Sequence, residues 1–336
     1  MNIWDGVDHL LDGWTDLDSL RDHRLQLLAA RRWRERGVDV PAPIMHDERA
    51  AIIHALMAPV LLQRIRNAVD GPIILFKGTD LAARFPDPTT RPYGDLDILV
   101  PDATAVHAAM MRAGFVVDDD EVNHLDSHNL VPLRWPGTPL PIEVHQSVHW
   151  VTWAPAPNVD ELFARAVPSR ARIDGYLGLA PEHYALILAA HAWRHHPLAD
   201  ILHLLDIALI AEECDPVALR ALARSWQLER MWLTTEAAYT ALFRGGPTPR
   251  GVSGYCVRQL RRGEERRAFE YFALRWLSAL WAQTPRQQAR GILRDLGFAV
   301  RARPNKSRTK MLRELVRSGT QPMLKYYRQY ENSRSG

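Results

Sequence analysis

Apolar residues recur every three to four positions through the first 70 residues of this 336-residue chain. Two segments carry the pattern: RDHRLQLLAARRWRERG, which ends at Gly37, and ERAAIIHALMAPVLLQRIRNAVDG, which ends at Gly71. This spacing predicts amphipathic helices, for which a glycine is a common stop. Pro59 interrupts the second segment, so we expect a kink or a break there.

The period shortens after residue 71. Short apolar and β-branched runs between turn residues predict strands in PIILF, DLDILV, FVVDDD, NLVPLRW and LPIEVHQSVHW. Between them, TDLAARF predicts a short helix with Thr79 as its N-cap, and DATAVHAAMMRAG predicts a helix that Asp102 caps and Gly114 ends. From Pro181 helical spacing returns in PEHYALILAAHAWRHH and DILHLLDIALIAEEC, and further helices follow to about residue 298.

These patterns divide the chain into four parts. They are N-terminal helices over 1–70 packed on the core, an α/β core over 71–170, a helical C-terminal domain over 171–300 and a basic tail over 301–336. The predicted fold class is therefore α+β, a mixed sheet with helices that is flanked by helical segments. The tail holds ten Lys or Arg and two Glu, which suits a solvated tail or contact with phosphate or RNA.

Composition excludes several protein classes. A hydrophobic content of 47% and a charged content of 24% are typical of a globular protein, and a net charge of +3 is too small for a general nucleic-acid binder. No apolar run reaches the ~18 residues of a membrane span, and the first residues lack the pattern of a signal peptide. Cys214 and Cys256 have no metal-ligand spacing. We expect a cytoplasmic protein without membrane association, and the sequence indicates no obligate protein partner.

Two carboxylates interrupt an otherwise apolar strand in RPYGDLDILV. Because side chains alternate along a strand, Asp95 and Asp97 share one face, where their charges repel unless a cation lies between them. Mg²⁺ (or Mn²⁺) suits this position, because it takes oxygen ligands and completes its shell with substrate phosphates. The alternative is an edge strand with both aspartates in water.

A possible phosphate-binding turn precedes these aspartates. Lys77, Gly78 and Thr79 follow a strand at a helix start, where glycine lets a phosphate approach the backbone and the two side chains add donors. Arg91 stands just ahead of the D-x-D strand and is placed to meet a polyphosphate. Taken singly, each of these residues also fits an ordinary turn or loop.

A third carboxylate occurs in the later strand IEVHQ. Glu143 and His145 share one face of that strand, and Ile142 and Val144 share the other. A solvated strand position for the glutamate and a core position for the histidine are the alternatives. Together with the turn and the D-x-D pair, the two residues suit one task, which is to hold a metal–nucleotide complex over a carboxylate cluster.

The segment FKGTDLAARFPDPTTRPYGDLDILV resembles the signature of the nucleotidyltransferase superfamily with a DNA polymerase β-like core. In that superfamily a Gly-Ser or Gly-Gly turn precedes a D-x-D strand, and a later strand supplies a third carboxylate. The segment is more closely similar to the bacterial uncharacterised nucleotidyltransferase family, through FKG at 76–78, FP at 85–86, RPYGDLDILV at 91–100 and EVH at 143–145. Thr79 departs from the Ser or Gly that is more usual.

The resemblance continues in HAWRHHPLADILHLLDIALI. It matches a histidine-containing helix and a following Asp of the family through His191, His195 and Asp206. The two histidines lie four residues apart, on one helix face. The resemblance implies that these residues, with His145, line the cleft or contact the acceptor, and helix packing is the alternative. Residues 211–336 match no motif, so the acceptor stays open.

The resemblance implies transfer of an NMP, with AMP from ATP expected first, to an acceptor hydroxyl, phosphate or amine with release of pyrophosphate. Asp95, Asp97 and Glu143 would be the catalytic carboxylates and the ligands of Mg²⁺ or Mn²⁺. The expected nucleotide contacts are Lys77, Gly78, Thr79 and Arg91. The acceptor could be a small molecule, a peptide or RNA. Three other interpretations remain: a tailoring enzyme of peptide or antibiotic biosynthesis that moves a nucleotide, phosphate or sugar, a tRNA-modifying toxin, and a catalytically silent nucleotide-binding protein.

Overall fold

The computed structural model describes residues 1–14, 16–118, 129–195, 197–263 and 281–290. Within these ranges a seven-stranded mixed sheet has the order β3-β4-β5-β2-β1-β7-β6. The strands are β1 (Ile74–Leu75), β2 (Leu96–Leu99), β3 (Val116–Val117), β4 (Leu133–Arg134), β5 (Ile142–His145), β6 (Val167–Pro168) and β7 (Leu177–Gly178). The α+β fold expected from the sequence is confirmed. The basic tail over 301–336 lies outside the described residues.

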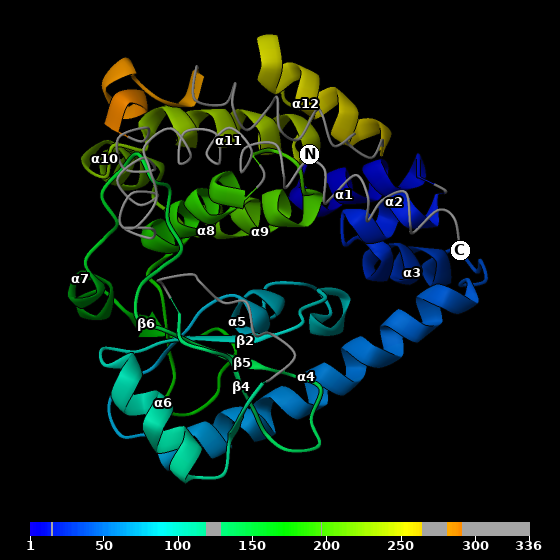
Figure 1. Ribbon diagram of the computed structural model, residues 1–336. Coiled ribbons are helices and arrows are strands. Elements are labelled where there is room, and N and C mark those ends of the chain that lie inside the picture. The colour runs from blue at the N-terminus through cyan, green and yellow to red at the C-terminus, as the bar shows by residue number, and fades with distance from the viewer. Residues whose placement is uncertain (15, 119–128, 196, 264–280, 291–336) are drawn as a thin grey trace, which may run out of the picture.

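Helices cover both faces of the sheet (Figure 1). Before and within the sheet they are α1 (Ile3–Asp12), α2 (Leu17–Asp22), α3 (Gln26–Glu35), α4 (Ala42–Ala68), α5 (Gly78–Ala82), the 3₁₀ helix η1 (Pro88–Thr90), α6 (Ala103–Arg112) and α7 (Val159–Ala164). After it come α8 (Pro181–His195), α9 (Ile201–Ala211), α10 (Pro216–Ser225), α11 (Glu229–Phe243) and α12 (Gly251–Arg262). None of the described helices combines the length and apolar character that a membrane span requires.

The N-terminal helices divide between two hydrophobic cores. Ile3 and Val7 of α1 join a core that includes residues of α8, α9 and α11. Leu62 and Ile65 of α4 join a second core, on the far face of the sheet, together with residues of α6. Figure 1 shows this arrangement, with α4 and α6 on one side of the sheet and α8 and α9 on the other.

The sequence predicted a kink or a break at Pro59; helix α4 continues through this residue, so the break is wrong. A proline inside a helix removes one backbone hydrogen bond. The surrounding residues Ala58, Leu61 and Leu62 are buried, and this packing holds the helix together, since helices in proteins are stabilised mainly by tertiary contacts. The predicted cap is confirmed in α6, where the Asp102 carboxylate accepts a hydrogen bond from the backbone N–H of Ala105.

The side chains of strand β2 alternate between the two cores. Leu96 and Ile98 face the α4–α6 side, and Leu99 faces the α8–α9 side. Asp97 shares the face of Leu99, because side chains two positions apart point the same way. The sheet therefore directs one carboxylate toward the C-terminal helices.

Candidate active site

The parallel pairing of β2 with β5 brings two carboxylates together. In this ladder Asp97 lies opposite Glu143, and Leu99 lies opposite His145. The sequence predicted that the Glu143 strand lies beside the D-x-D strand, and this pairing is confirmed. Val144 on the other face packs into the α4–α6 core, as alternation requires.

The three side chains form a compact polar cluster. His145 Nε2 lies 2.8 Å from Asp97 Oδ1 and 3.2 Å from Glu143 Oε2. The Asn129 amide donates to Glu143 Oε2 at 3.0 Å. One ligand atom from each of Asp97, Glu143 and His145 lies within 4.8 Å of the others, a spacing that can hold a metal ion.

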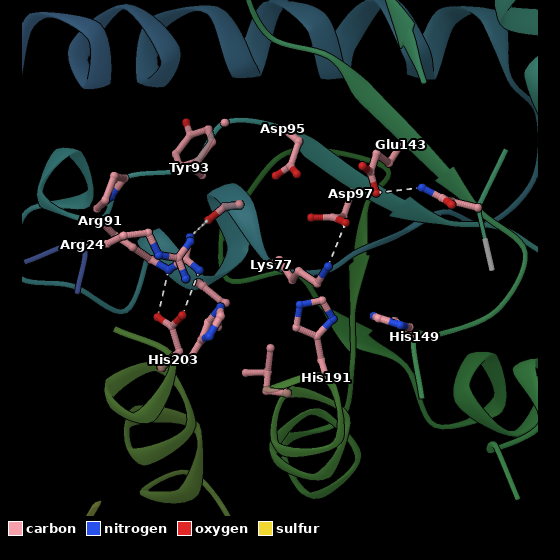
Figure 2. Close-up of a pocket in the computed structure, with 17 residues that line it drawn as sticks. Arg24, Lys77, Arg91, Tyr93, Asp95, Asp97, Glu143, His149, His191 and His203 are labelled. Carbon is pink, nitrogen blue, oxygen red and sulfur yellow. Dashed lines mark hydrogen bonds and ion pairs between the residues drawn. The ribbon is translucent and has the colours of Figure 1, made fainter. Parts of the chain in front are cut away.

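Lys77 is the nearest cation to this cluster in the described structure. Its Nζ lies 3.1 Å from Asp97 Oδ1, and the lysine stands between α5 and β1, a central strand of the sheet. Figure 2 shows Asp95, Asp97 and Glu143 next to one another, with Lys77 reaching toward Asp97. We call these three carboxylates the carboxylate edge. The lysine thus partly neutralises a carboxylate that is only 1% exposed.

The two aspartates of the D-x-D pair differ in their affinity for protons. The negative charge of Asp97 and burial raise the pKa of Asp95 to about 7. Burial works to raise the pKa of Asp97 as well, but the charge of Lys77 and the hydrogen bond from His145 outweigh it and lower that pKa to about 2. At neutral pH Asp97 is therefore fully ionised, whereas Asp95 is divided between its ionised and protonated forms.

Glu143 and His145 stabilise each other's charged forms. Burial disfavours the charged form of Glu143, but the hydrogen bond with His145 outweighs burial and lowers the pKa of the carboxyl. Burial likewise disfavours the charged imidazole, but hydrogen bonds with Asp97 and Glu143 raise the pKa of His145. The positive charges of Lys77 and His145 therefore offset those of the carboxylates in the cluster.

The donor set fits a divalent cation. Asp97 and Glu143 offer hard oxygen ligands, which Mg²⁺ and Mn²⁺ prefer. Among the described residues, the third member of this close group is His145 and not Asp95, which the sequence predicted as a ligand. Asp97 Oδ2 is buried and has no hydrogen-bond partner within the described part of the chain. A buried carboxylate oxygen without a partner is costly, so this atom is suited to a ligand that arrives with the substrate.

These carboxylates form one wall of a cavity of about 350 Å³. The opposite wall comes from the α2–α3 turn, the segment after β5, and helices α8 and α9, through Arg24, His149, His191 and His203. Figure 2 shows His149, His191 and His203 below Lys77 and facing the carboxylate edge. The cavity therefore lies between the sheet and the C-terminal helices, where a substrate would contact both.

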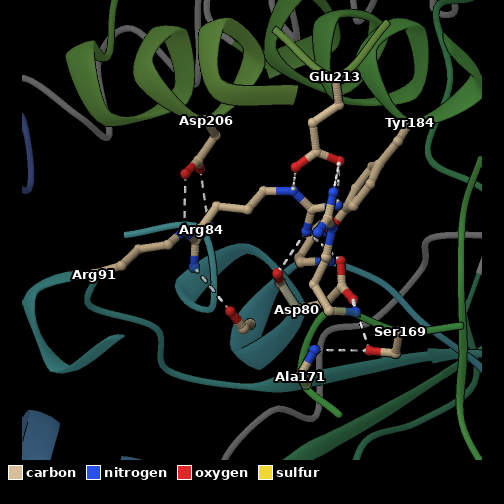
Figure 3. Close-up of polar contacts among 11 residues, drawn as sticks. Asp80, Arg84, Arg91, Ser169, Ala171, Tyr184, Asp206 and Glu213 are labelled. Carbon is tan, nitrogen blue, oxygen red and sulfur yellow. Dashed lines mark hydrogen bonds and ion pairs between the residues drawn. The ribbon is translucent and has the colours of Figure 1, made fainter. Parts of the chain in front are cut away.

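Two predicted site residues bind each other. The guanidinium of Arg91 donates from Nε and Nη2 to the two carboxylate oxygens of Asp206, at 2.8 and 2.9 Å (Figure 3). The two residues are 5% and 2% exposed, and both line the cavity. The pair occupies the Nε–H and one N–H of Nη2, so a phosphate that contacts Arg91 while the pair is closed meets only the remaining N–H groups of the guanidinium.

Of the remaining predicted site residues, some line the cavity and others do not. Gly78 lines the cavity, but Thr79 does not, and its buried hydroxyl has no hydrogen-bond partner among the described residues. The predicted N-cap role of Thr79 is wrong, because Lys77 occupies the cap position and α5 begins at Gly78. His195 ends α8, and its side chain lies outside the description.

A family model described as uncharacterised nucleotidyltransferase matches residues 14–244. The chain belongs to this nucleotidyltransferase family. The matched range contains both walls of the cavity, from Arg24 to Asp206. No curated protein and no solved structure matches the chain.

Several polar residues that line the cavity were not predicted from the sequence: Arg24, Tyr93, Asn129, His149 and His203. Only His203 carried a local signal, because it precedes Asp206 by three residues and so shares its helix face. Tyr93 lies inside the RPYGDLD segment, but nothing in its spacing indicates a contact with substrate. Arg24 and His149 reach the cavity only through the packing of distant elements.

Proposed function

We propose that this protein transfers an NMP, with AMP from ATP as the preferred case, to an acceptor hydroxyl, phosphate or amine and releases pyrophosphate. The observation that carries the proposal is the carboxylate edge, where Asp97 and Glu143 are opposite each other on paired parallel strands and Asp95 precedes them. It stands in a cavity large enough for part of a nucleotide, in a chain of a nucleotidyltransferase family.

Asp95, Asp97 and Glu143 would hold a divalent ion, which acts as a Lewis acid on the phosphates when bound. Lys77 would then exchange its contact with Asp97 for the triphosphate, because its Nζ is within reach of both the carboxylate and the cavity. Gly78 would let the phosphates come close to the backbone: a Cβ at this position would stand 3.3 Å from the Asp95 carbonyl oxygen, so the turn has little space to spare.

In the proposed reaction an acceptor oxygen or nitrogen forms a bond to the α-phosphorus. The bond from that phosphorus to the oxygen of the β-phosphate breaks, and pyrophosphate leaves. Glu143 takes the acceptor's proton, and the hydrogen bonds from His145 and Asn129 fix the orientation of its carboxylate. The remaining charge on the phosphates is balanced by Lys77.

The histidine-lined wall is the proposed site of the acceptor or the nucleobase. Neighbouring imidazoles pack edge to face there, with ring centroids 5.3 Å apart for His149 and His191 and 6.0 Å apart for His191 and His203. Burial lowers the pKa of His203 to about 4, so this ring is neutral and can both donate and accept hydrogen bonds at pH 7. Such a wall suits a polar, uncharged surface of a base, sugar or peptide.

Transfer is tested with ATP that carries ³²P at the α or at the γ position, Mg²⁺ and pools of small molecules, peptides and tRNA. We expect the α-label to enter an acceptor and the γ-label to appear only in pyrophosphate. Asp97→Asn should reduce the transfer by orders of magnitude, whereas Asp102→Asn, an exposed helix cap outside the cavity, should not. Entry of the γ-label into an acceptor would instead indicate phosphate transfer.

A further inference from the structure

Lys77 has a backbone conformation that side-chain-bearing residues rarely adopt. Its φ is 61° and its ψ is −153°, a combination that is almost confined to glycine. The next residue, Gly78, also has a positive φ of 42°. This conformation places the Lys77 side chain within reach of Asp97. Because the conformation is strained for a lysine, the surrounding structure must stabilise it.

A tyrosine from the C-terminal helices holds this backbone. Tyr184 of α8 is completely buried, and its hydroxyl accepts a hydrogen bond from the Lys77 N–H at 2.5 Å. The contact forms where the ladder of β1 ends: the Phe76 N–H still bonds to the Asp97 carbonyl, and the Lys77 N–H turns to the tyrosine. Without Tyr184 this buried N–H would lose its partner.

The ring of Tyr184 is itself fixed. The guanidinium of Arg84 lies 5.4 Å from the ring centroid, and Arg84 pairs with Asp80 and Glu213 (Figure 3). Asp80 accepts further hydrogen bonds from the Ser169 hydroxyl and the Arg170 N–H. The tyrosine hydroxyl therefore acts from a rigid network that joins α5, α8, the end of α9 and the β6 region.

We infer that Tyr184 is a positioning residue for nucleotide binding, which acts through Lys77. Its hydroxyl holds the strained backbone of Lys77, and this conformation directs the lysine amine into the cavity beside Asp97. Tyr184 does not line the cavity, so it acts on the nucleotide only through the lysine. The inference rests on the proposed function, in which Lys77 binds the triphosphate.

The chain offers a matched control. Tyr176 is also buried, and its hydroxyl donates to the backbone carbonyl of Leu62 at 2.7 Å, on the α4 side of the sheet. Tyr176→Phe and Tyr184→Phe both delete one buried hydroxyl that bonds to the backbone. Only Tyr184→Phe removes it from the turn that carries Lys77.

The experiment is calorimetric titration of the full chain with Mg²⁺ and α,β-methylene-ATP, which cannot release pyrophosphate. We expect Tyr184→Phe to raise the dissociation constant about tenfold, the effect of losing one aligned contact, and Tyr176→Phe to leave it unchanged. In a Lys77→Met background Tyr184→Phe should add no further weakening, because the side chain that it positions has lost its charge.

The outcomes separate this inference from the proposed function. If the wild-type protein binds no nucleotide, the proposed function fails and the role of Tyr184 with it. If Lys77→Met weakens binding but Tyr184→Phe does not, or if Tyr184→Phe weakens binding equally with and without the lysine, only the positioning role is overturned.

A second measurement needs no nucleotide. Glycine adopts the Lys77 conformation without strain, so Tyr184→Phe should lower the Tm less in a Lys77→Gly background than in a Lys77→Met background. Equal decreases in Tm in the two backgrounds would contradict the claim that Tyr184 stabilises the strained backbone of Lys77.

Discussion

Arg91 and Asp206, 115 residues apart in the chain, form a buried bidentate ion pair at the edge of the candidate active site. It joins the loop ahead of the D-x-D strand to helix α9. Burial disfavours the charged guanidinium, but the carboxylate of Asp206 outweighs it and raises the pKa of Arg91. The pair therefore connects the two walls of the cavity.

Removal of one partner should be costly. Asp206→Ala leaves a buried guanidinium without its carboxylate, and we expect a loss of about 3–5 kcal/mol in the free energy of unfolding, measured by urea denaturation. Glu236→Ala breaks the more exposed pair with Arg220 and should cost less than about 1 kcal/mol. Similar losses for the two variants would show that the buried pair is not a structural link.

The pKa of Asp95 predicts the pH dependence of metal binding. Because that pKa is about 7, a metal ion must displace a proton below neutral pH. The dissociation constant for Mn²⁺ should fall about tenfold per pH unit as the pH rises toward 7 and then level off. Calorimetry at several pH values in the absence of nucleotide measures this slope.

The control is Asp95→Asn, which should bind Mn²⁺ more weakly and without this slope. The same pKa shift predicts that metal-free protein loses stability as the pH rises from about 4 to about 7, because native Asp95 keeps a proton that the unfolded chain has released. A slope that persists in Asp95→Asn would assign the proton to another group, such as His145.

The strain at Lys77 predicts an unusual order of stabilities. Lys77→Gly and Lys77→Met both remove the ion pair with Asp97, but only glycine relieves the backbone. We expect the glycine variant to be more stable than the methionine variant by about 1 kcal/mol. This difference is the free energy of the backbone strain that glycine relieves, minus the conformational entropy that glycine loses on folding. Thermal unfolding of the two proteins measures the difference, and a more stable methionine variant would contradict it.

Glu143 is expected to act in the chemical step. Glu143→Gln should leave the affinity for Mg²⁺ with a non-hydrolysable nucleotide nearly intact and reduce the single-turnover rate about 10²- to 10⁴-fold. Glu161→Gln changes an exposed glutamate that pairs with the buried His183 outside the cavity; it serves as the control and should change neither quantity. Glutamine keeps an oxygen that can ligate the ion but cannot take the proton, so weaker nucleotide binding with an unchanged rate for the complex that still forms would limit Glu143 to holding the ion and contradict its role as the base.

The sequence predicted the carboxylate edge because its signals are local. Alternation in DLDILV and IEVHQ places Asp97, Glu143 and His145 on defined faces, and the family resemblance supplied the pairing of the two strands. The cap of α6 followed from Asp102 for the same reason. The strands β6 and β7 were missed, because each contains a proline or a glycine and, unlike β1 in PIILF, neither lies in a run of apolar or β-branched residues.

The wall of the cavity that faces the carboxylates could not be predicted from the sequence. Arg24, His149 and His203 come from separate elements, and only tertiary packing brings them to one cavity. Arg91 and Asp206 were predicted as independent contacts of the substrate, because no sequence signal shows that two distant charges pair. The continuous α4 across Pro59 has a similar cause, the burial of neighbouring residues on the sheet.

The central claim, that the carboxylate edge transfers a nucleotide, is tested most directly by the fate of the α-phosphate. The wild-type protein, Asp97→Asn and Asp102→Asn are incubated with Mg²⁺, ATP labelled with ¹⁵N in the adenine, and acceptor pools, and the products are analysed by mass spectrometry. We predict that an acceptor gains a labelled AMP group and that an equal amount of pyrophosphate is released. Both products should form with the wild-type protein and Asp102→Asn but not with Asp97→Asn. An acceptor that gains phosphate without the adenine label, or labelled product from Asp97→Asn at the wild-type level, would contradict the account.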